Sequence, residues 1–170
     1  MPVETNSNFE DAYIWAPVLA VFALNVILYI IGQLLKDNGI VDITWGFTFV
    51  IPNAVVLVLN SNIDHRTILS NILLLIWAIR MALNNGLRHE GEDWRYAEMR
   101  ENWMKKGKCF YYFAAYMFIY FTQSIFQLIM NSSALFISIW STPQFYFLDA
   151  LGACIWAFGF TFELVADLQL

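Results

Sequence analysis

Charged residues and cysteines are both scarce in this sequence, and each scarcity excludes a class of protein. Charged residues make up 14% of the chain, whereas a soluble domain usually carries about 25%. The two cysteines, Cys109 and Cys154, are too few for a disulfide framework and form no Cys-x-x-Cys motif. His65 and His89 have no partners at metal-ligand spacing, so the sequence predicts no metal site.

Lys and Arg residues, 9 in all, are fewer than the 14 Asp and Glu residues. The formal net charge is −5 and the pI is near 4.8, which excludes nucleic acid as an expected partner. No Lys or Arg precedes the first apolar run, so the N-terminus resembles neither a signal peptide nor a transit peptide. We therefore expect the first apolar run to be a permanent helix.

Long apolar runs dominate what remains, since 59% of residues are hydrophobic. A helix needs about 20 apolar residues to cross a bilayer core. The sequence predicts about five membrane spans: Trp15–Leu35, Val41–Leu59, Thr67–Leu83, Phe110–Met130 and Leu148–Leu170. Asn131, Ser132 and Ser133 are expected to end the fourth span and start a bend or shorter helix. The expected fold is an all-α, multi-pass membrane helix bundle that forms a single domain over residues 1–170.

The one long polar segment, residues 88–108, predicts an amphipathic interfacial helix. Tyr96, Met99 and Trp103 fall at helical spacing, as expected for aromatic and apolar groups at the headgroup level. Two ion pairs are expected along this helix, Glu92 with Arg95 and Glu101 with Lys105.

A sharper hypothesis gives this segment a ligand. Arg88, Arg95 and Arg100 would hold an anionic group near the membrane surface. The sequence leaves both interpretations open.

The distribution of Lys and Arg predicts the orientation. With five spans, eight of the nine Lys and Arg residues lie on one side, and only Arg66 lies on the other. By the positive-inside rule, the loop 88–108 faces the cytoplasm or matrix and the N-terminus lies outside. The mitochondrial inner membrane and the endoplasmic reticulum are not distinguished. Cys109 and Cys154 should then lie too far apart to form a disulfide.

The last span carries a stripe of residues on one helical face. Gly152, Trp156, Gly159, Glu163 and Asp167 follow one another at helical spacing. The glycines allow a neighbouring helix to approach closely. Two carboxylates one turn apart repel each other, so we expect a cation or a hydrogen-bond donor opposite them.

Two further charged residues lie at the ends of spans. Arg80 ends the third span, where it either reaches to the membrane surface or pairs with a carboxylate of the last helix, with Glu163 the first candidate. Asp42 begins the second span, and an Asp there is most often a helix N-cap.

Several motifs occur in an order that resembles a known family. They are Val41–Gly46 (VDITWG), Trp77–Arg80 (WAIR), Gly91–Tyr96 (GEDWRY) with Met99, Arg100 and Trp103, and Gly159–Gln169 (GFTFELVADLQ). Together they resemble the membrane reductases related to steroid 5-alpha-reductase, most closely the branch described as a domain of unknown function. The resemblance covers residues 40–170, which correspond to the N-terminal and central part of the reductase domain.

The resemblance implies a helical bundle that reduces a carbon–carbon double bond of a sterol-like or fatty enoyl lipid with NADPH. It assigns Arg80, Arg88, Glu163 and Asp167 to the cofactor side. It assigns no catalytic residue, because Trp77 stands where catalytic relatives have a tyrosine. Family members continue beyond the segment around Asp167 with the part that completes the cofactor pocket. We expect this chain to lack that part, and therefore to bind no cofactor alone.

Three functions stay open on the sequence. The first is a structural or accessory subunit of a larger membrane protein complex. The second is half of a split NADPH-dependent lipid or sterol reductase that another chain completes. The third is a lipid-binding bundle without chemistry. In each case we expect membrane lipids or other membrane subunits to cover Gly152, Trp156 and Gly159.

Overall fold

The computed structural model describes residues 7–60 and 63–169, and within them the chain forms helices and no strands. Four helices are long and apolar enough to cross a membrane: Ala12–Leu35, His65–Leu87, Lys108–Trp140 and Phe147–Gln169. The all-helical fold is therefore confirmed, and four candidate spans among the described residues indicate a membrane-embedded protein. Two predictions, that the N-terminus lies outside and that the last span ends at Leu170, concern residues outside this described part.

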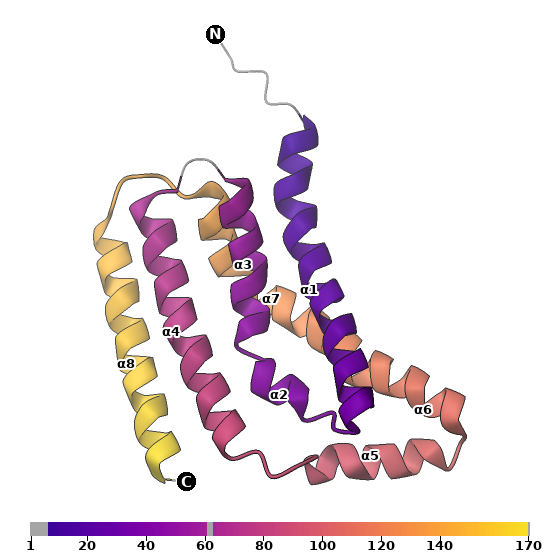
Figure 1. Cartoon of the computed structure of the whole chain (residues 1–170). Coiled ribbons are helices and arrows are strands. Elements are labelled where there is room, and N and C mark those ends of the chain that lie inside the picture. The colour runs from indigo at the N-terminus through magenta and orange to yellow at the C-terminus, as the bar shows by residue number, and fades with distance from the viewer. Residues whose placement is uncertain (1–6, 61–62, 170) are drawn as a thin grey trace.

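Two helices form the centre of the bundle. α3 (Phe47–Leu59) and α7 (Thr122–Trp140) contact each other, and both contact α1 (Ser7–Leu35) and α4 (His65–Leu87) (Figure 1). α4 begins two residues before the predicted Thr67, because the Asp64 carboxylate caps it by accepting from the Thr67 amide at 2.8 Å.

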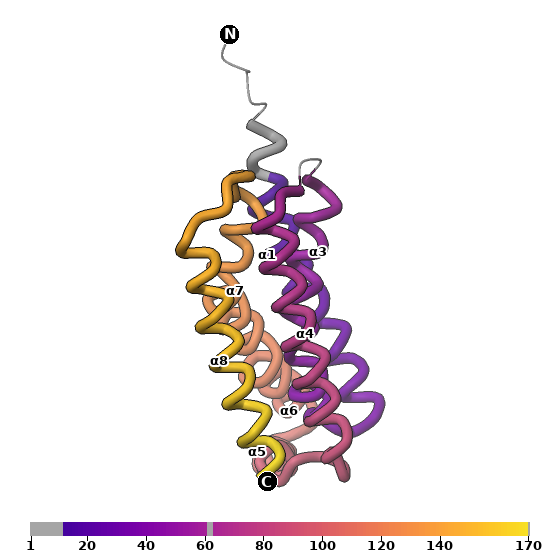
Figure 2. The backbone as a smooth tube through the Cα atoms, turned by 90° about the vertical axis from the view of Figure 1, so that its left-hand side faces the viewer, coloured from indigo at the N-terminus to yellow at the C-terminus, as the bar shows by residue number. Residues whose placement is uncertain are grey.

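The other elements lie at the edges of this bundle. α8 (Phe147–Gln169) runs alongside α4, as both views show (Figures 1 and 2). α5 (Trp94–Met104) lies across the end of the bundle where α1 and α4 finish (Figure 1). This confirms a separate helix within the polar segment 88–108. The pair between Glu101 and Lys105 along α5 is also confirmed, at 2.9 Å.

The second predicted span is not one continuous helix. It divides into α2 (Ile40–Thr44) and α3, which at 13 residues is too short to cross a bilayer core alone. The Thr44 and Thr48 hydroxyls donate to backbone carbonyls of the preceding turn, at 2.8 and 2.6 Å, and such bonds compete with regular helix bonds. Gly46 lies so close to α4 that an added Cβ would meet the Cα of Ala78 at 2.6 Å. The interruption between α2 and α3 thus lets the backbone at Gly46 approach α4 closely.

The fourth predicted span continues where a bend was expected. The helix runs without interruption through Asn131 to Trp140, so the prediction of an end near Met130 is wrong. The irregular part comes earlier, in the π-helical segment η1 (Tyr116–Phe121), which follows α6 (Lys108–Ala115). Asn131 does not break the helix because its amide is buried against α3, where its Nδ2 donates to the Phe49 carbonyl at 3.1 Å.

Polar side chains, all buried except the half-buried Asn71, connect α7 to α1, α3 and α4. We call this set the amide ladder; it consists of Asn25, Asn53, Asn71, Gln127, Asn131 and Ser138. Asn25 on α1 donates to Gln127 at 2.7 Å, and Asn53 on α3 donates to Asn131 at 3.0 Å. Ser138 donates to Asn53 at 2.9 Å and accepts from Asn71 on α4 at 3.1 Å. In an apolar solvent such bonds fix how helices align.

The ladder gives a prediction about stability. Replacing Asn131 with Ala removes two bonds to α3, so we expect the free energy of unfolding in detergent to fall by roughly 1 to 2 kcal/mol. The control is Ser132→Ala, because Ser132 is exposed and bonds only to its own helix, at Ile129. Equal effects of the two substitutions, measured by denaturant titration in mixed micelles, would contradict a role of the ladder in joining the helices.

Candidate functional site

Charged side chains meet between the C-terminal halves of α4 and α8. Nη2 of Arg80 lies 2.6 Å from Oε1 of Glu163, and Nη1 of Arg80 pairs with Asp167. Arg88 donates to the backbone carbonyl of Asp167. We call these four residues the ion cluster. They are the residues that the family resemblance assigns to the cofactor side, and the predicted pairing of Glu163 with Arg80 is confirmed.

The stripe of the last helix faces α4. Gly152 and Trp156 line one cavity between α4, α7 and α8, and Trp156, Gly159 and Glu163 line a second one between α4 and α8. Arg80, with a side chain only 11% exposed, bridges the two carboxylates at the end of the stripe. This explains how two like charges one turn apart are tolerated on a candidate span.

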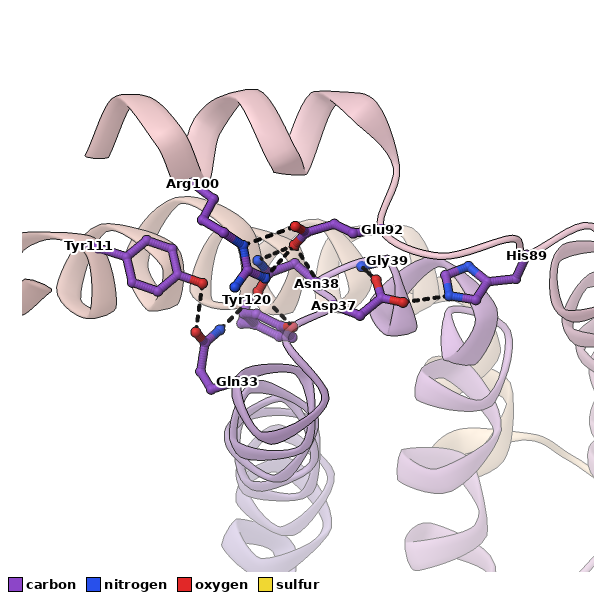
Figure 3. A network of polar contacts seen from close by, with 9 residues as sticks. All are labelled: Gln33, Asp37, Asn38, Gly39, His89, Glu92, Arg100, Tyr111 and Tyr120. Atoms are coloured by element: carbon purple, nitrogen blue, oxygen red, sulfur yellow. Dashed lines mark hydrogen bonds and ion pairs between the residues drawn. The ribbon is translucent and has the colours of Figure 1, made fainter. Parts of the chain in front are cut away.

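A second polar assembly ties the loop between α1 and α2 to α5 (Figure 3). Asn38, which is buried, donates to Oε1 of Glu92 from its backbone nitrogen at 3.0 Å and from its side chain at 2.9 Å. Arg100 binds both carboxylate oxygens of Glu92, at 2.9 and 2.6 Å. Gln33 and Tyr120 donate to the side-chain Oδ1 of Asn38 at 2.9 and 3.3 Å. Side chains from four segments are thus fixed around one loop.

The same loop holds a histidine in place (Figure 3). Oδ2 of Asp37 lies 2.6 Å from Nε2 of His89, and Oδ1 of Asp37 accepts from the Gly39 amide at 2.8 Å. The chain can turn here because Lys36 adopts a left-handed conformation with φ 56°. The Asp37 amide donates to the Gly32 carbonyl at 2.8 Å, as in a Schellman cap.

A cavity of about 610 Å³ lies beside the loop that carries Asp37 and Asn38, and His89 is one of its lining residues. Its size is within the range of about 300–1,000 Å³ typical of ligand sites. Its walls come from α2, the end of α4 and the loop before α5, and its ionisable lining residues are Asp42, Arg88, His89, Glu90, Asp93 and Arg95. Acidic and basic groups are mixed, so the cavity is not a positive pocket.

Local contacts shift the acidities of the groups on its wall. Burial raises the pKa of Asp42, although a hydrogen bond from Tyr96 (3.1 Å) and the charge of Arg95 act in the opposite direction. Burial also raises the pKa of Tyr96. Hydrogen bonds from Arg95 lower the pKa of Asp93. The two carboxylates that line the cavity, Asp42 and Asp93, therefore lie in different environments, and Tyr96, which does not line the cavity itself, donates to Asp42.

Two expectations about this region need correction. Asp42 is not an N-cap, because α2 begins after Gly39 and Asp42 instead accepts from Tyr96. Glu92 pairs with Arg100 and not with Arg95, because Glu92 lies before the start of α5. Arg95 pairs with Asp93 at 2.9 Å.

The three arginines proposed to bind an anion, Arg88, Arg95 and Arg100, do not line one site. Arg88 and Arg95 line the cavity, whereas Arg100 is held by Glu92 in the neighbouring network. Among the described residues, no group of three or more His, Cys, Asp or Glu side chains is arranged as a set of metal ligands. Cys109 and Cys154 are both free thiols.

The ion cluster predicts a large effect of removing its central cation. Arg80→Met leaves Glu163 and Asp167 facing each other without a partner, so we expect the free energy of unfolding to fall by about 2 kcal/mol. Adding Glu163→Gln and Asp167→Asn should recover part of that loss.

The matched control is Lys105→Met, which breaks the exposed pair with Glu101. Its expected effect is much smaller, because both side chains are exposed and water screens the pair. The free energies of unfolding of Arg80→Met and Lys105→Met are measured by denaturant titration in mixed micelles. Equal decreases in the two variants would show that the ion cluster does not hold α8 to α4.

Comparison with known proteins places the whole region in one family. The family model described as "Protein of unknown function (DUF1295)" matches residues 28–170, which include α2 to α8, the ion cluster and the cavity wall. No curated protein and no solved structure matches the chain. The chain therefore belongs to the family described as protein of unknown function DUF1295.

Proposed function

We propose that this protein is an accessory subunit that packs within a larger membrane protein assembly and does not reduce a substrate on its own. The supporting observation is that the arginines on the side of the proposed cofactor remnant are already bound inside the chain. Arg80 pairs with Glu163 and Asp167, Arg88 donates to the carbonyl of Asp167, Arg95 pairs with Asp93, and Arg100 pairs with Glu92. Binding a dinucleotide requires several cations that point at its phosphates.

The outer surface of α8 is consistent with this role. α8 contacts α4 more than any other element, and none of its described residues is buried. Phe158 and Phe162 lie one turn apart, 75% and 71% exposed. Aromatic side chains are enriched where proteins meet, so this surface is a reasonable place for another subunit. The expected orientation, with the loop 88–108 on the cytoplasmic or matrix side, is part of the same proposal.

The fold itself we attribute to a relative of steroid 5-alpha-reductase. The support is the ordered set of motifs from Val41–Gly46 to Gly159–Gln169. In this view residues 40–170 correspond to the N-terminal and central part of a reductase domain, and the ion cluster is a remnant of a cofactor site. Its carboxylates, Glu163 and Asp167, bind Arg80 rather than a ribose or an amide.

The alternative is half of a split NADPH-dependent lipid or sterol double-bond reductase completed by another chain. One observation favours it. The cavity of about 610 Å³ adjoins the ion cluster through Arg88, on the side where a cytosolic cofactor would enter. A partner that displaced the internal bonds of Arg88 would be needed to provide phosphate contacts.

Native gel analysis in a mild detergent tests the accessory role. The full chain, expressed in its own cells, should migrate in a complex larger than its 19.7 kDa. Phe158→Leu with Phe162→Leu keeps α8 apolar but removes the aromatic surface, so we expect at least a threefold loss of that complex. Phe118→Leu is the control, because Phe118 is 65% exposed on η1, away from α8. A wild-type chain that migrates alone would contradict the proposal.

Cofactor titration distinguishes the two functions. Because its arginines are paired internally, the purified chain in detergent should show no saturable NADPH binding below about 1 mM. Micromolar binding that Arg88→Ala weakens at least tenfold would instead support the reductase alternative. Lys36→Ala is a suitable control for nonspecific phosphate attraction, since Lys36 lies at the same end of the bundle but does not line the cavity.

A further inference from the structure

A largely apolar cavity of about 440 Å³ lies at the other end of the bundle, between α4, α7 and α8. Leu69 and Leu73 of α4, Ile137 of α7 and Trp156 of α8 form its apolar walls. Leu74 and Trp156 also line the cavity of about 330 Å³ that continues toward Glu163. The two cavities therefore adjoin and follow the seam between α4 and α8.

Small side chains create this space. A Cβ added at Gly152 or Gly159 would meet no atom within 4 Å, so α8 does not press its glycines against a neighbouring helix. α4, α7 and α8 all belong to candidate spans, so the apolar seam faces hydrocarbon rather than water. α4 and α8 already contact each other, which leaves no room for another helix of about 10 Å diameter between them. A single acyl chain is thin enough to enter.

One opposite-charge pair lies at the mouth of the cavity. Nε of Arg66 lies 2.8 Å from Oδ1 of Asp149, and Nη1 of Arg66 donates to the Thr142 hydroxyl at 3.4 Å. The Arg66 guanidinium also lies over the Tyr146 ring, 5.9 Å from its centroid. Nη2 of Arg66 donates to no described residue, and arginine is suited to binding phosphate oxygens. Asp149 offers a carboxylate to a cation beside that phosphate.

We propose that this cavity binds one zwitterionic phospholipid of the surrounding bilayer. One acyl chain lies between α4 and α8 along Trp156, the phosphate binds Arg66, and the ammonium group lies near Asp149. Charge complementarity selects this lipid, since an anionic lipid has no cation to place beside Asp149. The lipid would complete the packing of α8, whether or not the chain belongs to a larger assembly.

Native mass spectrometry of the full chain tests this proposal. The protein is reconstituted in vesicles of phosphatidylcholine, extracted in mild detergent and delipidated in steps. We expect one phosphatidylcholine to remain on each wild-type chain. Gly152→Leu puts a side chain into the cavity at a position where an added Cβ meets no atom within 4 Å, and it should lower the retained fraction at least fivefold. Cys154→Leu places a leucine at an exposed neighbouring position that does not line the cavity, and it should have no effect.

Two further arms identify the lipid and guard against misfolding. Arg66→Gln should lower retention at least threefold, and vesicles of phosphatidylglycerol should yield less retained lipid than those of phosphatidylcholine. Ser133→Leu adds bulk from α7 and should repeat the effect of Gly152→Leu, with helix content by circular dichroism unchanged in at least one of the two variants. Equal retention by wild type and by a folded cavity-filling variant would overturn the proposal. Retention of a sterol or of phosphatidylglycerol in preference to phosphatidylcholine would overturn it as well.

Discussion

The arrangement of this bundle depends on hydrogen bonds between polar side chains buried in an apolar medium. Lipid offers no hydrogen-bond partners, so buried amides must find them on neighbouring helices. α7 provides three such groups, at Gln127, Asn131 and Ser138, on one helical face. Because their partners lie on α1, α3 and α4, a sliding movement of any of these helices would break at least one buried bond. The amide ladder thus sets the alignment of the four central helices.

α8 stands outside the ladder, and this explains both its contacts and the space beside it. It is joined to α4 by charges near its two ends, Arg66 with Asp149 and Arg80 with Glu163 and Asp167. Between these ends, Gly152 and Gly159 present no side chain to α4. Ion pairs hold two helices at the length of an arginine side chain, whereas interlocking side chains would bring them closer. A helix held by charges at both ends and by glycines between them leaves a seam, and the cavities occupy that seam.

The sequence predicts elements well where length and apolar content decide, and poorly where a single polar residue has two possible roles. The span 65–87 and the helix within 88–108 follow from composition. Asn131 indicates a break by its polarity, yet it is buried because Asn53 lies opposite, and no sequence pattern relates two residues that far apart. The split of the second span depends on the approach of Gly46 to Ala78. Arg80 and Glu163 could be paired because the predicted spans place both near the same end of the bundle, whereas Glu92 reaches Arg100 only after the chain turns before α5.

The same pairing of charges bears on what the protein can do. A site that binds a phosphate needs cations whose charge is not already neutralised, and in an apolar surrounding an arginine without a partner is costly. A membrane protein that awaits a charged ligand must therefore leave some arginines exposed to water or bound to water. Here Arg80, which the family resemblance assigns to the cofactor side, pairs with both Glu163 and Asp167 of α8. A ligand could take Arg80 only by loosening α8 from α4. The charge of Arg80 is thus committed to the bundle, and this favours a structural role for the pairs that it forms.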